Sequence, residues 1–327
     1  TRRHRHVDIE RRPGYWVGRG APSFHPLGKA VTVHSKDNAS WLVIRGIQRL
    51  TSCFHYENYR WYWTGSMVAM VTFRMQDVVL GWQMLEATDS AFWVGLVAFA
   101  HNLPLLIWSP ITGMWADRPK RRQMIAAALL LSAVTSAVLA LVLAFGHASP
   151  WHIIALSFLV GSAFALYAPA RLALLPNLIP THVLPRASAF EYSSTRLMGF
   201  FGPMVAGVLV DVLDVAPTLF IQAVMFSLAA AIFVWSGKTD GPRAHQGSQA
   251  HMLSGLREAV VYLGQDRPLL ALTCLGLVMV PIGMSYQKLM PVFTQDVLGA
   301  GASTLGLLLG TVSLGAALAG FAVAATE

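Results

Sequence analysis

The sequence contains eight mainly apolar runs, each about as long as a helix needs to cross a lipid bilayer. A bilayer core about 30 Å thick takes roughly 20 such residues per helical crossing. Backbone polar groups in lipid must be satisfied within the segment, and these runs lack the alternation of barrel strands, so we expect helices. The runs are Trp61–Leu85, Ala91–Met114, Gln123–Phe145, Pro150–Ala168, Ser188–Val212, Thr218–Ser236, Pro268–Met290 and Ser303–Ala325. They predict an all-α integral membrane protein.

The composition indicates lipid, rather than water, as the main solvent. Of the 327 residues, 55% are hydrophobic and 12% are charged, and the mean hydropathy is +0.52, whereas about a quarter of a soluble domain is charged. The net charge of +8 does not indicate nucleic-acid binding, because no folded recognition element accompanies the basic residues of the N-terminal tail. We expect residues 1–58 to form a disordered cytoplasmic tail that contacts anionic lipid head groups.

The distribution of charge between the runs predicts their orientation. Lys and Arg gather after the second, fourth and sixth runs, whereas the alternate loops carry mainly acidic side chains, apart from Lys288 at the end of the seventh run. Because Lys and Arg stay in cytoplasmic loops, we expect both ends of this chain in the cytoplasm. The predicted location is the plasma (cytoplasmic) membrane.

The spacing of the runs divides the chain into two groups of helices. Residues 59–236 hold six crossings joined by short loops. Residues 237–267 form a cytoplasmic linker whose second half has apolar residues at helical spacing, which is typical of an amphipathic helix on the membrane surface. Residues 268–327 then begin a second bundle with two crossings.

The loop after the second run carries a recognisable motif. Gly113 is followed four and five residues later by Asp117 and Arg118, and then by the basic pair Arg121 and Arg122. This pattern resembles the signature between helices two and three of the major facilitator superfamily. The simpler alternative, that the arginines only orient the loop, would not require the Gly and the Asp.

The fifth run holds a second motif, in which Gly202 and Pro203 are followed by Gly207. It partly resembles the superfamily's antiporter signature, in which Gly and Pro bend the helix and allow close packing. A bent packing helix without a role in antiport is the alternative. Together with the sequence around Pro169 and Arg171, these motifs resemble the branch of enterobactin-exporter-like and macrolide-efflux-like proteins.

The resemblance implies a major-facilitator-type helical bundle with twelve helices in two six-helix bundles. Eight of the twelve are present here, so the chain is interpreted as a fragment that lacks the last four. The implied function is secondary active transport by alternating access. The expected process is proton-coupled efflux of a drug-like compound or siderophore, and the expected oligomeric state is a monomer. The expected partners are a small-molecule substrate, protons and the lipid bilayer, with no cofactor and no metal.

Ionisable residues inside the apolar runs are the candidate proton-coupling or cavity residues. A charge at the centre of a membrane helix costs about 2.5–3.5 kcal/mol on the insertion scale. Such residues are Arg74 and Asp77 in the first run, His101 in the second and Arg196 in the fifth. We interpret Asp77 as the candidate coupling carboxylate and His101 as a secondary candidate. Arg74 lies three residues before Asp77, so a structural ion pair without a role in transport is an equal alternative.

Transport has three alternatives, of which an enzyme is the first. The sequence holds no metal-ligand spacing and no nucleophile motif that would indicate an enzyme. A non-transporting membrane receptor or scaffold of the same fold is the second alternative, because a fold does not dictate function. A truncated fragment without activity is the third alternative.

Overall fold

The computed structural model describes residues 52–116, 121–146, 148–236, 262, 264 and 267–326. Residues 52, 109–116, 267, 276–285 and 317–326 are described by their backbone alone. The predicted tail up to residue 51 and most of the predicted linker at 237–267 lie outside the described residues.

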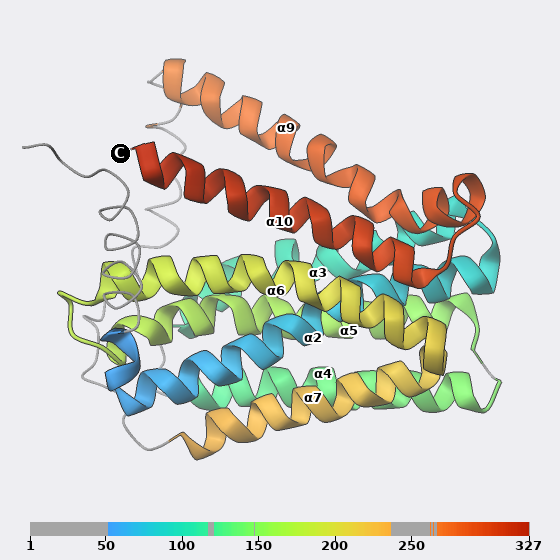
Figure 1. The fold of residues 1–327 in the computed structure, drawn as a ribbon, viewed down its shortest axis with the longest axis horizontal. Coiled ribbons are helices and arrows are strands. Elements are labelled where there is room, and N and C mark those ends of the chain that lie inside the picture. Colours follow the sequence, from blue (N-terminus) through green and yellow to red (C-terminus); the bar gives the residue numbers. More distant parts are fainter. Residues whose placement is uncertain are drawn as a thin grey trace, which may run out of the picture. The chain divides into compact units, whose positions relative to one another are not determined.

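Long helices account for nearly all of the described residues (Figure 1). They are α2 (Glu57–Thr88), α3 (Ala91–Ala116), α4 (Arg121–Ala144), α5 (Pro150–Leu174), α6 (Leu184–Leu213), α7 (Val215–Trp235), α9 (Arg267–Val292) and α10 (Ala302–Thr326). Three short elements accompany them, namely the 3-10 turns η1 (Ser52–His55) and η2 (Leu175–Asn177) and the π-helical turn η4 (Phe293–Val297). Each predicted run coincides with one of the long helices, and the predicted all-α membrane fold is confirmed.

Among the described residues, five helices are long and apolar enough to cross a membrane by composition alone: α3, α4, α5, α6 and α7. The shorter apolar segment Ala302–Ala316 begins α10. The remaining long helices include α2, whose middle carries Arg74 and Asp77. Such charges are tolerated in a membrane where they face the interior of the bundle.

The first six long helices pack around two apolar clusters. In this group, α4 contacts α5 and α7, α3 contacts α5, and α2 contacts both α6 and α7. One cluster includes the buried rings of Phe73, Tyr167 and Phe226, with Phe73 and Phe226 only 4.8 Å apart between ring centroids. Large apolar side chains on the outside of the helices remain exposed, as expected for surfaces that contact lipid, for example Leu106, Val134, Phe220 and Val234.

The first apolar cluster also includes residues from the predicted tail, 1–58. η1 precedes α2 directly, and within it Cys53 is buried. The Phe54 ring packs edge-on against Tyr59, Trp63 and Phe190, with ring centroids 5.2–5.6 Å apart. Order therefore begins before residue 58, because these aromatic contacts fix the approach to α2.

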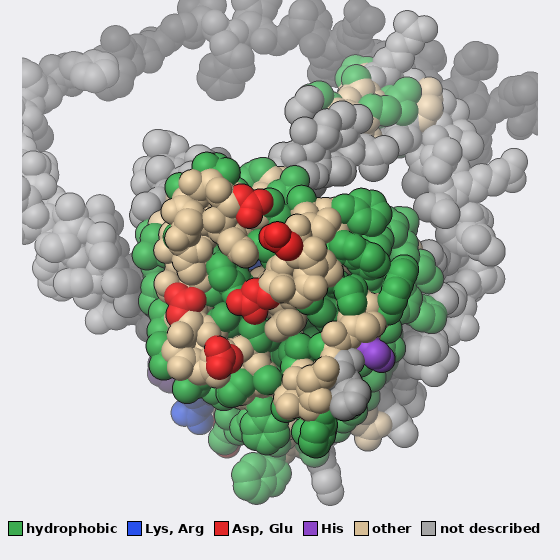
Figure 2. Space-filling model, turned by 90° about the vertical axis from the view of Figure 1, so that its right-hand side faces the viewer, with side chains coloured by type: hydrophobic (Ala, Val, Ile, Leu, Met, Phe, Trp, Pro, Cys, Tyr) green, Lys and Arg blue, Asp and Glu red, His purple; other side chains and the backbone are tan. Residues whose placement is uncertain are grey.

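At one end of the molecule, short connections join α2 to α3, α4 to α5, α6 to α7 and α9 to α10 (Figure 1). We call this the hairpin end. Figure 2 looks onto it and shows acidic side chains gathered over its surface. Its acidic residues are Glu86, Asp89, Asp211, Asp214 and Asp296. The charge agrees with the prediction that this end faces outward, and the orientation itself stays a prediction.

Close contact between α6 and α10 joins the first group of helices to the second. A Cβ atom on Gly207 would overlap the carbonyl oxygen of Ala302, and one on Gly306 would overlap that of Pro203. Small residues allow backbones to approach in this way in membranes. Farther from the hairpin end, a Cβ on Gly315 would meet nothing within 4 Å, and Figure 1 shows α9 and α10 leaving the other helices in that direction.

The start of α10 is also capped by a side chain from α6. The carboxylate of Asp211 accepts hydrogen bonds from the backbone N–H groups of Ala302 and Ser303, both at 2.9 Å. The first N–H groups of a helix lack partners within the helix, and a carboxylate there satisfies them and interacts favourably with the helix dipole. The hairpin end therefore holds α6 and α10 together by both packing and hydrogen bonding.

A buried polar cluster holds α2, α5 and α6 together near the opposite end. Arg171 contacts Glu191 at 2.7 Å between Nη1 and Oε1, and the Tyr62 hydroxyl donates to the same Oε1 at 2.9 Å. The side chains of Arg171 and Glu191 are 10% and 4% exposed. Breaking such a pair leaves an uncompensated buried charge, which is strongly destabilising, so these three helices are expected to stay together.

Candidate functional site

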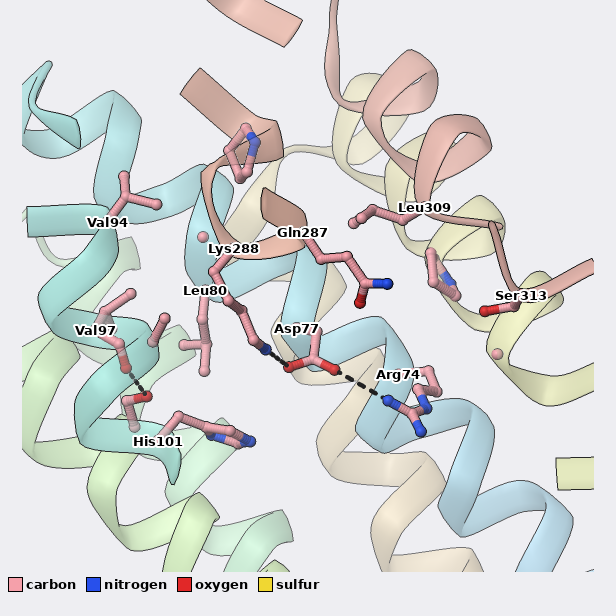
Figure 3. Close-up of a pocket in the computed structure, with 16 residues that line it drawn as sticks. Arg74, Asp77, Leu80, Val94, Val97, His101, Gln287, Lys288, Leu309 and Ser313 are labelled. Carbon is pink, nitrogen blue, oxygen red and sulfur yellow. Dashed lines mark hydrogen bonds and ion pairs between the residues drawn. The ribbon is translucent and has the colours of Figure 1, made fainter. Parts of the chain in front are cut away.

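Asp77, in the middle of α2, lies between two cationic side chains (Figure 3). One is Arg74, whose Nη1 is 3.7 Å from Oδ2 of Asp77. The other is Lys288 on α9, whose Nζ donates to Oδ1 of Asp77 at 2.9 Å. The Arg74 contact is the ion pair that the spacing predicted. The shorter Lys288 contact was not predicted and joins residues 211 positions apart.

Two cavities meet at this charged cluster. Their volumes are about 80 Å³ and about 180 Å³. Both are lined by the same five polar residues, Arg74, Asp77, His101, Gln287 and Lys288. The smaller cavity extends along α2 toward the hairpin end, with the apolar residues Leu80, Val94, Val97 and Pro291 in its wall. The larger extends toward the opposite end, with Met70, Phe73, Leu105 and Phe164. The charged cluster therefore lies between two largely apolar spaces.

The helix packing explains why Arg74 and Asp77 reach this position. α6 contacts α2 through Gly202, where a Cβ atom would come 2.5 Å from the Cβ of Arg74. Only a residue without a side chain allows α6 to pass so near. On the other side of the smaller cavity, Leu309 and Ser313 of α10 complete the wall. The site is thus formed by α2, α3, α5, α6, α9 and α10 together.

His101 lines both cavities from α3. Its neighbour Ser157 on α5 donates through Oγ to the carbonyl oxygen of Val97 at 3.3 Å and lines the smaller cavity with it. This hydrogen bond ties α5 to the turn of α3 that precedes His101. The secondary candidate therefore shares a site with Asp77.

The fourth candidate, Arg196, lies elsewhere. Its guanidinium group contacts the Tyr192 hydroxyl at 2.7 Å and lies over the Tyr192 ring at 4.9 Å from the centroid. The side chain is exposed and lines neither of the two cavities. The partner of Arg196 is thus Tyr192, one turn earlier on α6. The structure does not bring Arg196 together with Asp77.

The loop motif is only partly described. Gly113 lies in α3, and Asp117 and Arg118 lie outside the described residues. Arg121 donates to the carbonyl oxygen of Ala173 at 2.7 Å, and Arg122 donates to that of Ser236 at 2.7 Å. Both carbonyls lie at or near helix C-termini, where cations are favourable. These two arginines therefore connect the start of α4 to the ends of α5 and α7.

The motif in α6 lies at two helix contacts. Gly202 faces Arg74 of α2, as described above, and Gly207 faces the start of α10. Pro203 lies inside α6, lines the smaller cavity and presents its carbonyl oxygen to Gly306 of α10. The motif thus serves close packing on both sides of the cavity, which is the role that its Gly and Pro content indicates.

Comparison with known proteins identifies the family. Residues 50–326 match the profile of a family described as transmembrane secretion effectors, within the major facilitator superfamily. The chain belongs to this family. It is 25% identical over 237 residues to macrolide efflux protein A of Streptococcus pyogenes, an alignment that covers 72% of the chain and 58% of that protein. It is 22% identical over 261 residues to the staphyloferrin A transporter of Staphylococcus aureus, covering 80% of the chain and 65% of that protein.

These relatives set the frame for interpreting the site. The chain spans about three fifths of the length of the relatives it matches. A weaker similarity, 22% over 222 residues, links it to human monocarboxylate transporter 6. The family member described here is a multi-pass membrane protein with the superfamily's α-helical fold.

Proposed function

We propose that this chain forms part of a secondary active transporter that exports a small molecule at the expense of the proton gradient. The observation that carries the proposal is the position of Asp77, a carboxylate inside a cavity between the two groups of helices. Asp77 forms ion pairs with Arg74, in the first group of helices, and with Lys288, in the second group. A proton-coupling site requires such a group, because its charge must be able to form and disappear inside the membrane.

The cavity walls suit a small organic molecule. Ligand pockets are commonly lined by apolar side chains with a few convergent polar groups, and the two cavities combine apolar walls with Asp77, His101 and Gln287. In transporters built from repeated bundles, rocking of one bundle against the other exposes a central site to each side in turn. Macrolide efflux protein A and the staphyloferrin A transporter among the relatives support export of a drug-like compound or siderophore.

We also propose an orientation in the membrane and an oligomeric state. The hairpin end faces the outside of the plasma membrane, and the protein acts as a monomer. This orientation rests on the acidic surface of the hairpin end and on the basic residues of the opposite loops.

The test compares Asp77→Asn with the native protein, each expressed from its complete reading frame and assayed in inverted vesicles. Proton movement is followed with a pH-sensitive dye after addition of a macrolide or staphyloferrin A. We expect the native protein to show substrate-induced proton movement and Asp77→Asn to lose it, because an amide cannot bind and release a proton at this site. Asp89→Asn is the matched control, since Asp89 is an exposed carboxylate at the hairpin end.

Insertion of each variant is checked by size-exclusion chromatography in detergent. Unchanged proton movement in Asp77→Asn would leave Asp77 as one half of a structural ion pair. Absence of any substrate flux by the native protein would favour a non-transporting membrane protein of the same fold.

A further inference from the structure

Lys288 forms the ion pair that connects Asp77 to the second group of helices. The Arg74 contact lies within α2 and cannot hold two helices together, whereas the Lys288 contact joins α2 to α9. Lys288 is also held in register along α2, because Pro291, one turn later on α9, packs against Gly81 and lines the same cavity. The lysine therefore lies at the boundary between the two groups that must move for alternating access.

The charges of the site make this contact dependent on the state of Asp77. The groups around the carboxylate are Arg74 from α2, His101 from α3 and Lys288 from α9, and the described residues of α6 and α10 in the cavity wall carry no charge. Ionised Asp77 attracts Lys288, and no other carboxylate lines either cavity within the described residues. Once Asp77 is protonated, Lys288 loses this attraction and is left beside Arg74, which repels it.

The side chain also has room to leave. Lys288 is 38% exposed and Asp77 27% exposed, and the exposed parts face the cavities (Figure 3). A lysine side chain is flexible and carries a single compact charge. It can therefore withdraw into the adjoining cavity while α2 and α9 keep their backbones in place.

We propose that Lys288 holds the unloaded transporter in one conformation through its ion pair with Asp77. This inference rests on the proposed proton-coupled transport. An exchanger must change conformation when it carries a proton or a substrate and must not do so when empty, because an empty return lets protons cross without export. Lys288 supplies that restriction, since it bridges the two groups of helices only while Asp77 is ionised and unoccupied.

The same geometry restricts the chemistry of the substrate. A substrate that replaces Lys288 must present to Asp77 a group that can take the place of the ammonium. The group is a cationic or hydrogen-bond-donating nitrogen or a hydroxyl, carried on an otherwise apolar body that fits the cavity walls.

The experiment measures proton leak without substrate. The protein, expressed from its complete reading frame, is reconstituted into liposomes with an imposed pH gradient, and the decay of the gradient is followed with an internal dye. We expect Lys288→Met to leak about tenfold faster than the native protein, a change that corresponds to about 1.4 kcal/mol. Lys288→Gln is a second neutral variant in case Met does not insert, and Lys288→Arg restores the native low leak because it keeps the bridging charge.

Two further variants separate a lost bridge from a damaged fold. Arg196→Gln removes one positive charge from an exposed side chain of α6 that lines neither cavity, and we expect its proton leak to equal that of the native protein. Adding Asp77→Asn to Lys288→Met removes the proton carrier, so the leak of the single variant should disappear.

The proposal is wrong if both neutral Lys288 variants leak no faster than the native protein, if Arg196→Gln leaks as fast as they do, or if the leak persists in the double variant. The outcome also separates this inference from the proposed function. If the native protein couples proton movement to substrate and the Lys288 variants leak protons no faster than it does, only the proposed role of Lys288 is refuted. Native protein without substrate-induced proton movement would refute the coupling itself.

Discussion

Gly306 offers the sharpest test of the contact between α6 and α10. A Cβ atom at this position would overlap the carbonyl oxygen of Pro203. That oxygen belongs to the backbone of a packed helix, so it cannot move aside as the end of a flexible side chain could. Overpacking of a tight interface costs about 1–3 kcal/mol. For a protein of this size, each kcal/mol lowers the melting temperature by about 2 °C, so Gly306→Ala should melt about 2–6 °C lower.

The assay is thermal unfolding in detergent, followed by intrinsic fluorescence and size-exclusion chromatography. The matched control is Gly315→Ala on the same helix, where the added Cβ would meet nothing within 4 Å. It should leave the melting temperature unchanged or raise it slightly, because Ala is a better helix former than Gly by about 1 kcal/mol. Equal melting temperatures for the two variants would show that α6 and α10 do not approach as described.

Two further predictions concern the buried cluster and the orientation. Glu191→Gln should lower the free energy of unfolding by about 3–5 kcal/mol, because it leaves the guanidinium of Arg171 buried without a counter-charge; equilibrium unfolding in detergent measures this, and a loss below about 1 kcal/mol would contradict it. In a variant without native cysteines, single cysteines at 149 and 213 should react with an impermeant maleimide on intact cells, because Leu213 is exposed at the hairpin end. Cysteines at 120 and 246 should react only after permeabilisation; the reverse pattern would invert the topology.

The sequence predicted the helices well because the membrane imposes one requirement on every crossing. Apolar length alone placed each run on its helix, and the three-residue spacing of Arg74 and Asp77 was sufficient to predict their contact. Both inferences depend on local periodicity. The family followed from a loop motif whose residues are also close together in the sequence.

The parts of the site that were not predicted depend on contacts between distant helices. Lys288 was assigned to the end of its run, although it is the one charged residue inside the apolar run Pro268–Met290, a signal that marks intramembrane function. Glu191 was overlooked in the same way within the run Ser188–Val212. Arg196 was included because the sequence does not give the rotation of a helix about its axis, and Tyr192 lies one turn before it as a local partner.

The Asp211 cap has a consequence for how the protein is made. The first N–H groups of α10 follow Gly301, which has no side chain to accept their hydrogen bonds, and the acceptor comes from α6. α6 leaves the ribosome about ninety residues before α10, as the spacing between Asp211 and Ala302 shows. The acceptor is therefore already synthesised when the first turn of α10 enters the membrane, and the order of synthesis supplies the start of α10 with its partner in time.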